Sequence, residues 1–456
     1  MMRPHLAMTT AALTILCGAC LLGSAPATAA PRSITVQQED LGAITVLAPQ
    51  TQPERFVVYI SDHDGLTPLR LAEVETIVAR GAAVALLDLP KLQTTLAGLK
   101  DEECYYVFGD IEDVARTAQR QLGMTEWRWP MMFGVGDGGT LSYLMLAQAP
   151  DNTSGGAVSI GFVPQLKGNV PLCPGAPMIG HANGVIGYKP FDDVPGPWVL
   201  IAPAAVTADV QAFQDATDGA RIDIVEGDDA KRFAAAVDAL FAMAPKSAEG
   251  LADLPLTELP AEGSPKSLFI LISGDGGWRD IDKQIGEYLS KNGVSVVGVD
   301  SLRYFWSRRE PKHIASDLNR IAEHYRDKWK LESVGIGGYS FGADVIPLSW
   351  PYLPKDLQAR TKLIALLGLE TTADLQVSVT GFLGIKDSND IEIHPFLAGL
   401  PKDKTVCFYG TAEAKAGETA CVAQELDGAT VVERPGGHHF DGKYEPVADM
   451  ILERLK

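Results

Sequence analysis

The sequence predicts an α/β protein with two tandem domains, each built on a mostly parallel sheet. Short buried-strand patterns alternate with helical patterns, which is the arrangement of right-handed β-α-β units. The same order of strands, glycine turns and helices occurs twice along the chain. A length of 456 residues also suits two or three domains.

The first 29 residues read as a cleavable signal peptide. Arg3 is the only charged residue before the apolar run from Ala11 to Leu22. That run is too short to span a bilayer comfortably, and Ala27-Thr-Ala29 suits signal peptidase. We therefore expect cleavage after Ala29 and export, with an uncleaved membrane anchor as the alternative.

The first domain is predicted over residues 30–248. Its first strand and turn, Arg55 to Gly65, resemble Leu268 to Gly277 of the second half. In both halves a helix that ends at glycine and a strand that ends at aspartate follow, over Ala79–Leu89 and Lys291–Ser301. The two domains should therefore share one topology.

The two halves differ at a glycine turn. Aligning Gly134-Val-Gly136 on Gly335-Ile-Gly337 places Gly139 opposite Ser340. The first half then keeps the turn without a nucleophile, and we predict that the first domain lacks a catalytic triad.

Residues 249–265 are predicted to be a linker. Pro255, Pro260 and Pro265 punctuate this stretch, which has no long apolar run. The second domain is then expected to cover residues 266–456.

The strongest functional motif is Gly338-Tyr-Ser-Phe-Gly342, a G-x-S-x-G turn between an apolar strand and a helical pattern. Its glycines permit a tight, strained turn that lifts the Ser340 hydroxyl above the sheet edge. The same turn directs the backbone N–H of Phe341 toward a developing oxyanion. A glycine-rich turn with an idle serine is the alternative.

A histidine pair follows the last predicted strand, in Pro435-Gly-Gly-His-His-Phe440. The chain order of this kind of site is serine, acid, histidine. We predict His438 as the general base, with His439 as the alternative. Lys231 and Arg232 occupy the aligned positions of the first half.

The acid is predicted to follow the preceding strand, Thr405–Gly410. Glu413 lies just past its end and would accept the Nδ1–H of His438, which fixes the tautomer of the imidazole. The competing carboxylates are those of Asp387, Asp390 and Glu418.

A second oxyanion donor is predicted in the first strand-to-helix loop of the second domain, Ser273–Trp278. Its glycines let the backbone approach a substrate oxygen, and the N–H of Gly274 or Asp275 is the candidate. A phosphate-binding turn is the rival interpretation, although the G-K-[ST] of a P-loop is missing.

Three consecutive aromatic residues follow the next strand, at the same predicted sheet edge as the serine. Tyr304, Phe305 and Trp306 are predicted to form a wall of an acyl or lipid pocket, with Arg308 available to a phosphate. Packing within the domain core is the alternative.

Four cysteines follow the predicted cleavage site. An even number in an exported chain suits disulfides, and we prefer pairing within each half, Cys104–Cys173 and Cys407–Cys421. The second bridge would staple the loop that carries Glu413. The spacings do not fit a zinc site, and we predict no metal and no cofactor.

A net charge of −19 argues against a nucleic-acid partner. An acidic protein is also repelled by an anionic membrane surface, whereas a cationic lipid head group would attract it.

Four segments of the second half form a combination that is more specific than any one of them. They are Ser273-Gly-Asp-Gly-Gly-Trp278, Asp300-Ser-Leu-Arg-Tyr-Phe-Trp306, Gly338-Tyr-Ser-Phe-Gly-Ala-Asp344 and Gly436-Gly-His-His-Phe440. The combination resembles the VirJ/AcvB family of bacterial periplasmic proteins, and the signal peptide and duplicated first half resemble its long form.

The resemblance implies an α/β-hydrolase in the periplasm. Its substrate would be aminoacylated phosphatidylglycerol at the membrane surface, chiefly the lysyl form, and the aminoacyl ester would be cleaved. The resemblance also implies partners among virulence or type IV secretion proteins. Two alternatives stay open: an esterase of another acyl ester, and a non-catalytic periplasmic chaperone or adaptor for exported virulence factors.

Overall fold

The structure is a computed structural model of the chain. It describes residues 30–98, 104–168, 170–243, 251, 254–263, 265–377 and 390–456. The predicted signal peptide and the competing acid Asp387 therefore lie outside the described residues.

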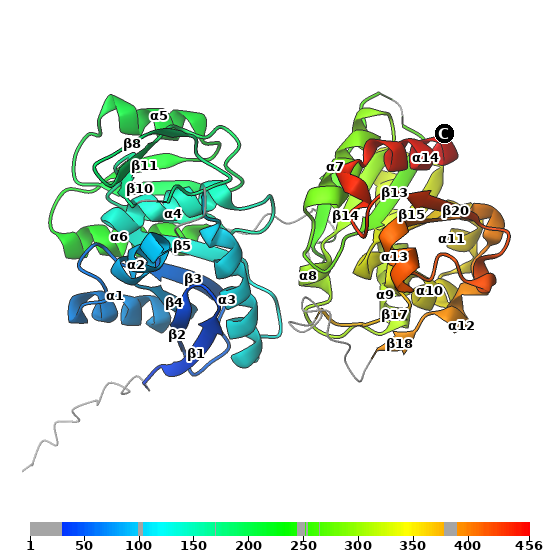
Figure 1. Cartoon of the computed structure of the whole chain (residues 1–456), viewed down its shortest axis with the longest axis horizontal. Helices are drawn as coiled ribbons and strands as arrows, with labels where there is room; N and C mark the ends of the chain where they lie inside the picture. Colours follow the sequence, from blue (N-terminus) through cyan, green and yellow to red (C-terminus); the bar gives the residue numbers. More distant parts are fainter. Residues whose placement is uncertain are drawn as a thin grey trace, which may run out of the picture. The chain divides into compact units, whose positions relative to one another are not determined.

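The first half holds an eight-stranded sheet with strand order β1-β2-β4-β3-β5-β6-β10-β11 (Figure 1). β2 is antiparallel to β1 and β4, and the other neighbours are parallel. The strands are β1 Arg32–Gln38, β2 Gly42–Ala48, β3 Arg55–Ile60, β4 Ala82–Leu87, β5 Pro130–Val135, β6 Ala157–Ile160, β10 Trp198–Ala202 and β11 Arg221–Ile224. The helices are α1 Pro68–Ala79, α2 Leu89–Gly98, α3 Val107–Gln121, α4 Asp137–Gln148, α5 Ala208–Ala216 and α6 Asp229–Ala242. A small antiparallel sheet joins β7 Gln165–Lys167, β8 Met178–Ala182 and β9 Val185–Tyr188.

The second half holds a seven-stranded sheet with strand order β12-β14-β13-β15-β16-β19-β20. Only β12 is antiparallel to its neighbour in this sheet. The strands are β12 Leu256–Leu259, β13 Ser267–Ile272, β14 Ser295–Val299, β15 Ser333–Tyr339, β16 Thr361–Leu367, β19 Thr405–Gly410 and β20 Thr430–Arg434, with β17 Thr372–Ala373 and β18 Ile391–Glu392 forming a separate pair. The helices are α7 Asp280–Lys291, α8 Ser301–Tyr304, α9 Pro311–Trp329, α10 Phe341–Ser349, α11 Lys355–Arg360, α12 His394–Leu397, α13 Thr411–Ala416 and α14 Glu445–Leu455.

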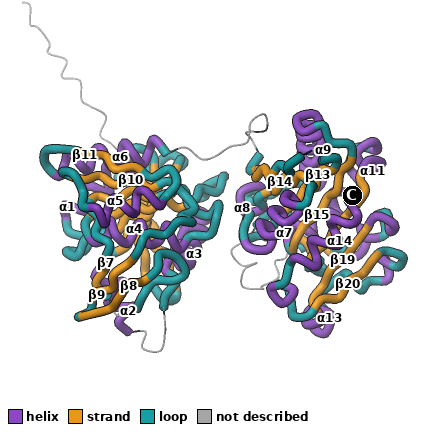
Figure 2. The backbone as a smooth tube through the Cα atoms, turned by 90° about the horizontal axis from the view of Figure 1, so that it is seen from above, coloured by secondary structure: helices purple, strands orange, loops and turns teal. Residues whose placement is uncertain are grey.

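Helices cover both faces of each sheet, which explains why the central strands are apolar without alternation. In β3, Phe56 and Val58 belong to a buried cluster with residues of α3 and α4, whereas Val57 and Tyr59 pack with α1 and α6. The second sheet repeats this division, with α9 and α10 on one face and α7 and α14 on the other. Figure 2 shows the orange strands within each half among purple helices. The predicted α/β class and shared topology are confirmed.

Both predicted disulfides, Cys104–Cys173 and Cys407–Cys421, are present. None of the helices among the described residues has the length and apolar content that a membrane span requires.

The predicted linker contains a strand. Within residues 249–265, β12 pairs antiparallel with β14 from Leu256 to Leu259 and forms one edge of the second sheet. Pro255 and Pro260 flank the strand and therefore remove no hydrogen bond from its interior. The second α/β unit thus begins earlier than the predicted residue 266.

Parallel pairing places the carboxyl ends of β13, β15, β16, β19 and β20 at one edge of the second sheet. In open α/β sheets this edge is where ligands bind. The loops that leave these five strands carry all of the predicted catalytic residues.

Candidate active site

Ser340 occupies a strained turn between β15 and α10. Its backbone has φ 52° and ψ −124°, a conformation that costs a non-glycine residue free energy. A Cβ on Gly338 would lie 2.2 Å from the backbone of Gly342, and one on Gly342 would lie 2.1 Å from the carbonyl oxygen of Ile272. No side chain fits at either glycine, so the G-x-S-x-G spacing follows from the geometry of the turn.

His438 and Glu413 form a hydrogen-bonded pair. The distance from His438 Nδ1 to Glu413 Oε1 is 2.6 Å. Glu413 is buried in the first turn of α13, and its Oε2 accepts the N–H of Gly410 at 2.6 Å. Both oxygens of the carboxylate are thus held by hydrogen bonds, and one of these bonds is with His438, as predicted.

The pKa values of this pair move in opposite directions. Burial alone would raise the pKa of Glu413, but the hydrogen bond from His438 and the N–H of Gly410 outweigh it and lower the pKa. Burial would lower the pKa of His438, but Glu413 and the negative charges of Glu370 and Asp275 raise it above its usual range. Glu413 is therefore ionised and strongly favours a protonated His438.

The end of β16 places the Ser340 backbone beside the His438 ring. The Ser340 N–H donates to the Leu367 carbonyl oxygen at 2.8 Å. A Cβ on the next residue, Gly368, would lie 2.9 Å from Cε1 of His438. Tyr339, directly before the serine, has its ring centroid 5.2 Å from that of His438. Ser340 and His438 line the same cavity, so the structure brings the three predicted triad residues together.

The alternative base and acids make other contacts. His439 is exposed, and its Nδ1 lies 3.1 Å from the Tyr339 hydroxyl. Among the described carboxylates, only that of Glu413 is hydrogen-bonded to His438, so Asp390 and Glu418 do not compete for it.

The predicted oxyanion loop lies against the serine. A Cβ on Gly274 would be 3.8 Å from Cβ of Ser340, and Asp275 lines the cavity that contains Ser340. The Gly274 N–H points to Asp282 Oδ2 at 3.4 Å. Burial raises the pKa of the Asp275 carboxyl, which nearby cationic groups only partly offset.

The predicted aromatic wall lies in the core. Tyr304, Phe305 and Trp306 are all buried and do not line the cavity of Ser340. The Tyr304 hydroxyl donates to Asp317 Oδ2 at 2.6 Å, and the Phe305 ring packs 4.9 Å from that of Phe341. The packing alternative therefore describes Tyr304 and Phe305, and Trp306 is likewise buried outside this cavity.

Arg308 also lies away from the cavity that contains Ser340. Its guanidinium is paired with Glu310 at 3.5 Å and with Asp374 at 3.8 Å. Two carboxylates thus partner the guanidinium for which a phosphate contact was predicted.

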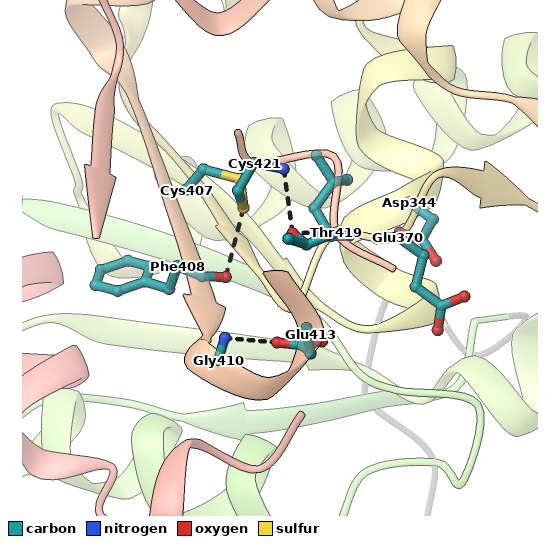
Figure 3. Close-up of a disulfide and its surroundings, with 9 residues drawn as sticks. Asp344, Glu370, Cys407, Phe408, Gly410, Glu413, Thr419 and Cys421 are labelled. Atoms are coloured by element: carbon teal, nitrogen blue, oxygen red, sulfur yellow. Dashed lines mark hydrogen bonds between the residues drawn. A yellow bond between two sulfur atoms is a disulfide. The ribbon is translucent and has the colours of Figure 1, made fainter. Parts of the chain in front are cut away.

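Glu370 is a cavity residue that no sequence motif indicated. It follows β16, is exposed and lines the cavity with Ser340 and His438. Its N–H donates to Oδ1 of the buried Asp344 at 2.9 Å, which holds the backbone in place. Figure 3 shows the Glu370 carboxylate pointing away from the Cys407–Cys421 bridge. Its position just past a strand becomes a signal only when the order of the strands is known, because that order brings the end of β16 to this site.

The Cys407–Cys421 disulfide closes the segment that contains Glu413 (Figure 3). Beside the bridge, the Thr419 hydroxyl donates to the Leu369 carbonyl oxygen at 3.0 Å and accepts the Cys421 N–H at 3.1 Å. The bridge therefore joins β19 to the end of the acid segment, and Thr419 beside it ties that segment to Leu369, just beyond β16.

The first half keeps the turn but differs from the predicted alignment. Gly136, between β5 and α4, has φ 58° and ψ −123°, so it and not Gly139 is the counterpart of Ser340. Closely spaced glycines allow several alignments, and only backbone angles distinguish them.

The histidine loop is also shorter in the first half. Only residues 225–228 separate β11 from α6, whereas residues 435–444 separate β20 from α14. Lys231 and Arg232 lie in α6 and are therefore not the counterparts of His438 and His439.

A parallel sheet with a nucleophile turn after β15, an acid after β19 and a histidine after β20 defines the class of α/β-hydrolase folds. Within that class, residues 266–456 match the family described as bacterial virulence protein (VirJ).

Solved structures of the same class are similar in fold. Est1E from Butyrivibrio proteoclasticus is 14% identical over 43% of this chain and 90% of its own, with a TM-score of 0.30. XC6422 from Xanthomonas campestris, an α/β serine hydrolase without a lid, is 16% identical over 44% and 87%, with a TM-score of 0.29. MenH from S. aureus is 13% identical over 44% and 97%, with a TM-score of 0.34. Comparison with curated proteins finds no match.

Proposed function

We propose that the protein is a periplasmic serine esterase that cleaves the aminoacyl ester of aminoacylated phosphatidylglycerol, lysyl-phosphatidylglycerol above all. The products would be the free amino acid and phosphatidylglycerol. The observation that carries the esterase chemistry is the hydrogen-bonded His438–Glu413 pair beside the strained turn of Ser340.

In the proposed mechanism, Ser340 Oγ attacks the aminoacyl carbonyl carbon while His438 takes the hydroxyl proton. The backbone N–H groups of Phe341 and Asp275 would hold the oxyanion. The N–H of Gly274, the other predicted donor, points to Asp282 Oδ2 at 3.4 Å. Phosphatidylglycerol then leaves with the proton from His438, and the aminoacyl group stays on Ser340.

Deacylation repeats these roles with water as the nucleophile. His438 takes a proton from the water, which attacks the acyl-enzyme, and then returns a proton to Ser340 as the amino acid leaves. Glu413 keeps the imidazole in the required tautomer throughout and stabilises its charged form.

The proposal of a lipid substrate rests on the family match and on the charges that line the cavity. The second half matches the VirJ family, and the carboxylates of Asp275 and Glu370 line the cavity that contains the serine. Arg279 of the second half also lines this cavity, but its positive charge is paired with the carboxylate of Asp280 at 3.0 Å. Carboxylates beside the reacting ester would favour an acyl group that carries an amine, as a lysyl group does.

The test is hydrolysis of lysyl-phosphatidylglycerol in mixed micelles by the purified mature protein, with released lysine as the readout. We expect Ser340→Ala to fold normally and to lose roughly three orders of magnitude or more in turnover. Near-normal turnover by this variant would contradict the mechanism. Activity on a simple aryl ester without lysine release would support the esterase activity but contradict the lipid substrate.

A non-catalytic chaperone or adaptor for exported virulence factors is the second candidate, since folds of this class can serve as scaffolds. Absence of wild-type activity on both the lipid and the aryl ester would favour this candidate, as would full biological complementation by Ser340→Ala.

A further inference from the structure

The first half preserves the backbone of a nucleophile turn. Gly136 matches Ser340 within a few degrees in φ and ψ, and each residue directly precedes a helix after the central strand of its sheet. In the second half, this turn presents the N–H of the next residue, Phe341. Its counterpart in the first half is the N–H of Asp137.

The loop after β3 supplies the partner of this donor. Ser61 and Ser273 correspond, because the hydroxyl of each accepts the N–H at the start of the helix that follows the neighbouring strand, from Leu89 of α2 at 3.0 Å and from Ser301 of α8 at 2.9 Å. The residues that follow then correspond as well. Asp62 takes the place of Gly274, and His63 that of Asp275.

Both counterpart donors are occupied by one carboxylate oxygen. Asp62 Oδ1 accepts the N–H of His63 at 2.7 Å and the N–H of Asp137 at 3.0 Å. Two backbone N–H groups that converge on one oxyanion are the arrangement of an oxyanion hole. Here the oxyanion belongs to the protein itself.

The same carboxylate fills the space of the missing nucleophile. A Cβ on Gly136 would lie 2.2 to 2.4 Å from the carboxyl atoms of Asp62. The second half has the reverse combination, with a glycine at 274 in the loop and a serine at 340 in the turn. The first half therefore has a side chain in the loop and none in the turn, whereas the second half has a side chain in the turn and none in the loop.

The charge of Asp62 agrees with this role. Its side chain is 19% exposed, and its Oδ1 lies 2.9 Å from Nδ1 of His63. Burial would raise the pKa of Asp62, but the two N–H donors and His63 outweigh it and lower the pKa. Asp62, His63 and Asp137 also bring ligand atoms within 4.8 Å of one another. The N–H bonds to Asp62 explain this cluster without a cation.

We infer that the first half contains an oxyanion-binding site whose resident ligand is the Asp62 carboxylate. Removal of this side chain exposes two convergent N–H donors that bind a small external carboxylate. In the native chain the site is closed to acyl groups, and the first half contributes no second hydrolytic centre.

The experiment measures acetate binding to the mature protein by saturation-transfer NMR at constant ionic strength. Asp62→Gly, which copies the second half, and Asp62→Ala should both bind acetate, whereas the wild type should not. Asp62→Asn should not bind either, because its amide oxygen still fills the hole. Asp64→Ala is the matched control, since it removes an acid from the same loop without opening the hole.

Circular dichroism and thermal unfolding of each variant, compared with the wild type, report whether the first half is folded. If Asp62→Gly does not fold, Asp62→Ala carries the test. Two results would overturn the inference: a folded Asp62→Ala that binds no acetate, and equal acetate binding by Asp64→Ala or the wild type.

Discussion

At the scale of single residues, His438 has conflicting requirements. A general base must be neutral when it takes the serine proton, yet Glu413, Glu370 and Asp275 all favour the charged imidazole and raise its pKa. Activity should therefore fall as the pH drops through this raised pKa. The carboxylates stabilise the imidazolium that forms in the transition state. Because they also raise the pKa of His438, the enzyme loses activity at low pH.

We predict that Glu370→Gln shifts the acid limb of the pH profile of kcat/KM to lower pH. Removing this negative charge weakens one of the effects that raise the pKa of His438. The measurement is aryl-ester hydrolysis across the pH range. Glu425→Gln, which removes a carboxylate that instead contacts the ring of His394, is the control and should leave the profile in place. An unshifted limb in Glu370→Gln would contradict the assignment.

The two neighbouring histidines should behave differently. His438→Ala is expected to lose activity to roughly the level of Ser340→Ala, because residues that act as a unit give similar losses. His439→Ala removes the contact with the Tyr339 hydroxyl and a ring contact with His438, but it leaves the His438–Glu413 hydrogen bond in place. It should keep activity within about tenfold, a change worth about 1.4 kcal/mol. Steady-state kinetics on one aryl ester would decide, and the opposite ranking would assign the base to His439.

At the scale of elements, α13 and its disulfide position the acid. The bridge closes a segment with a sequence separation of 14, and a loop of this length stabilises a fold by about 3 kcal/mol in the chain-entropy estimate. Because the bridge lies beside the end of β16, it also restricts the place where Glu413 meets His438.

We expect the paired change Cys407→Ala with Cys421→Ala to lower both the free energy of unfolding of the second half and kcat. Denaturant unfolding and aryl-ester kinetics would measure the two effects. Removing Cys104 and Cys173 instead should spare kcat, since that bridge belongs to the first half. Equal losses of kcat in the two pairs would show that the effect is not local.

Local patterns predicted much of the fold and of the candidate site. The turn of Ser340, the apolar strands and the acid just beyond β19 all depend on residues close in sequence. Glu370 could not be found in this way, because its place beside His438 comes from the pairing of β16 with β15 and β19. The aromatic run at Tyr304 was ambiguous for another reason, since pocket walls and cores use the same side chains. β12 is too short to show a strand period.

At the scale of the whole molecule, the net charge bears on access to the proposed lipid substrate. With a net charge of −19, the protein is attracted to a cationic lipid surface and repelled by an anionic one. The Debye length falls from about 30 Å at 0.01 M salt to about 8 Å at 0.15 M, so this attraction is screened near physiological salt.

Hydrolysis of lysyl-phosphatidylglycerol in vesicles rich in that lipid should therefore slow as salt rises. In vesicles diluted with phosphatidylglycerol the salt dependence should reverse, because screening then removes repulsion. A neutral, soluble aryl ester in the same salt series is the control and should show little change. A rate on vesicles that does not depend on salt would show that the net charge plays no part in access to the lipid.

The exchange between Asp62 and Gly136 also bears on how the duplicated half can change over time. A serine at 136 would collide with Asp62, while loss of Asp62 alone leaves no nucleophile. The loop before α6 would in addition have to lengthen and acquire a histidine. Several separate changes would therefore be needed to build a catalytic triad in this half, and no single substitution would supply one.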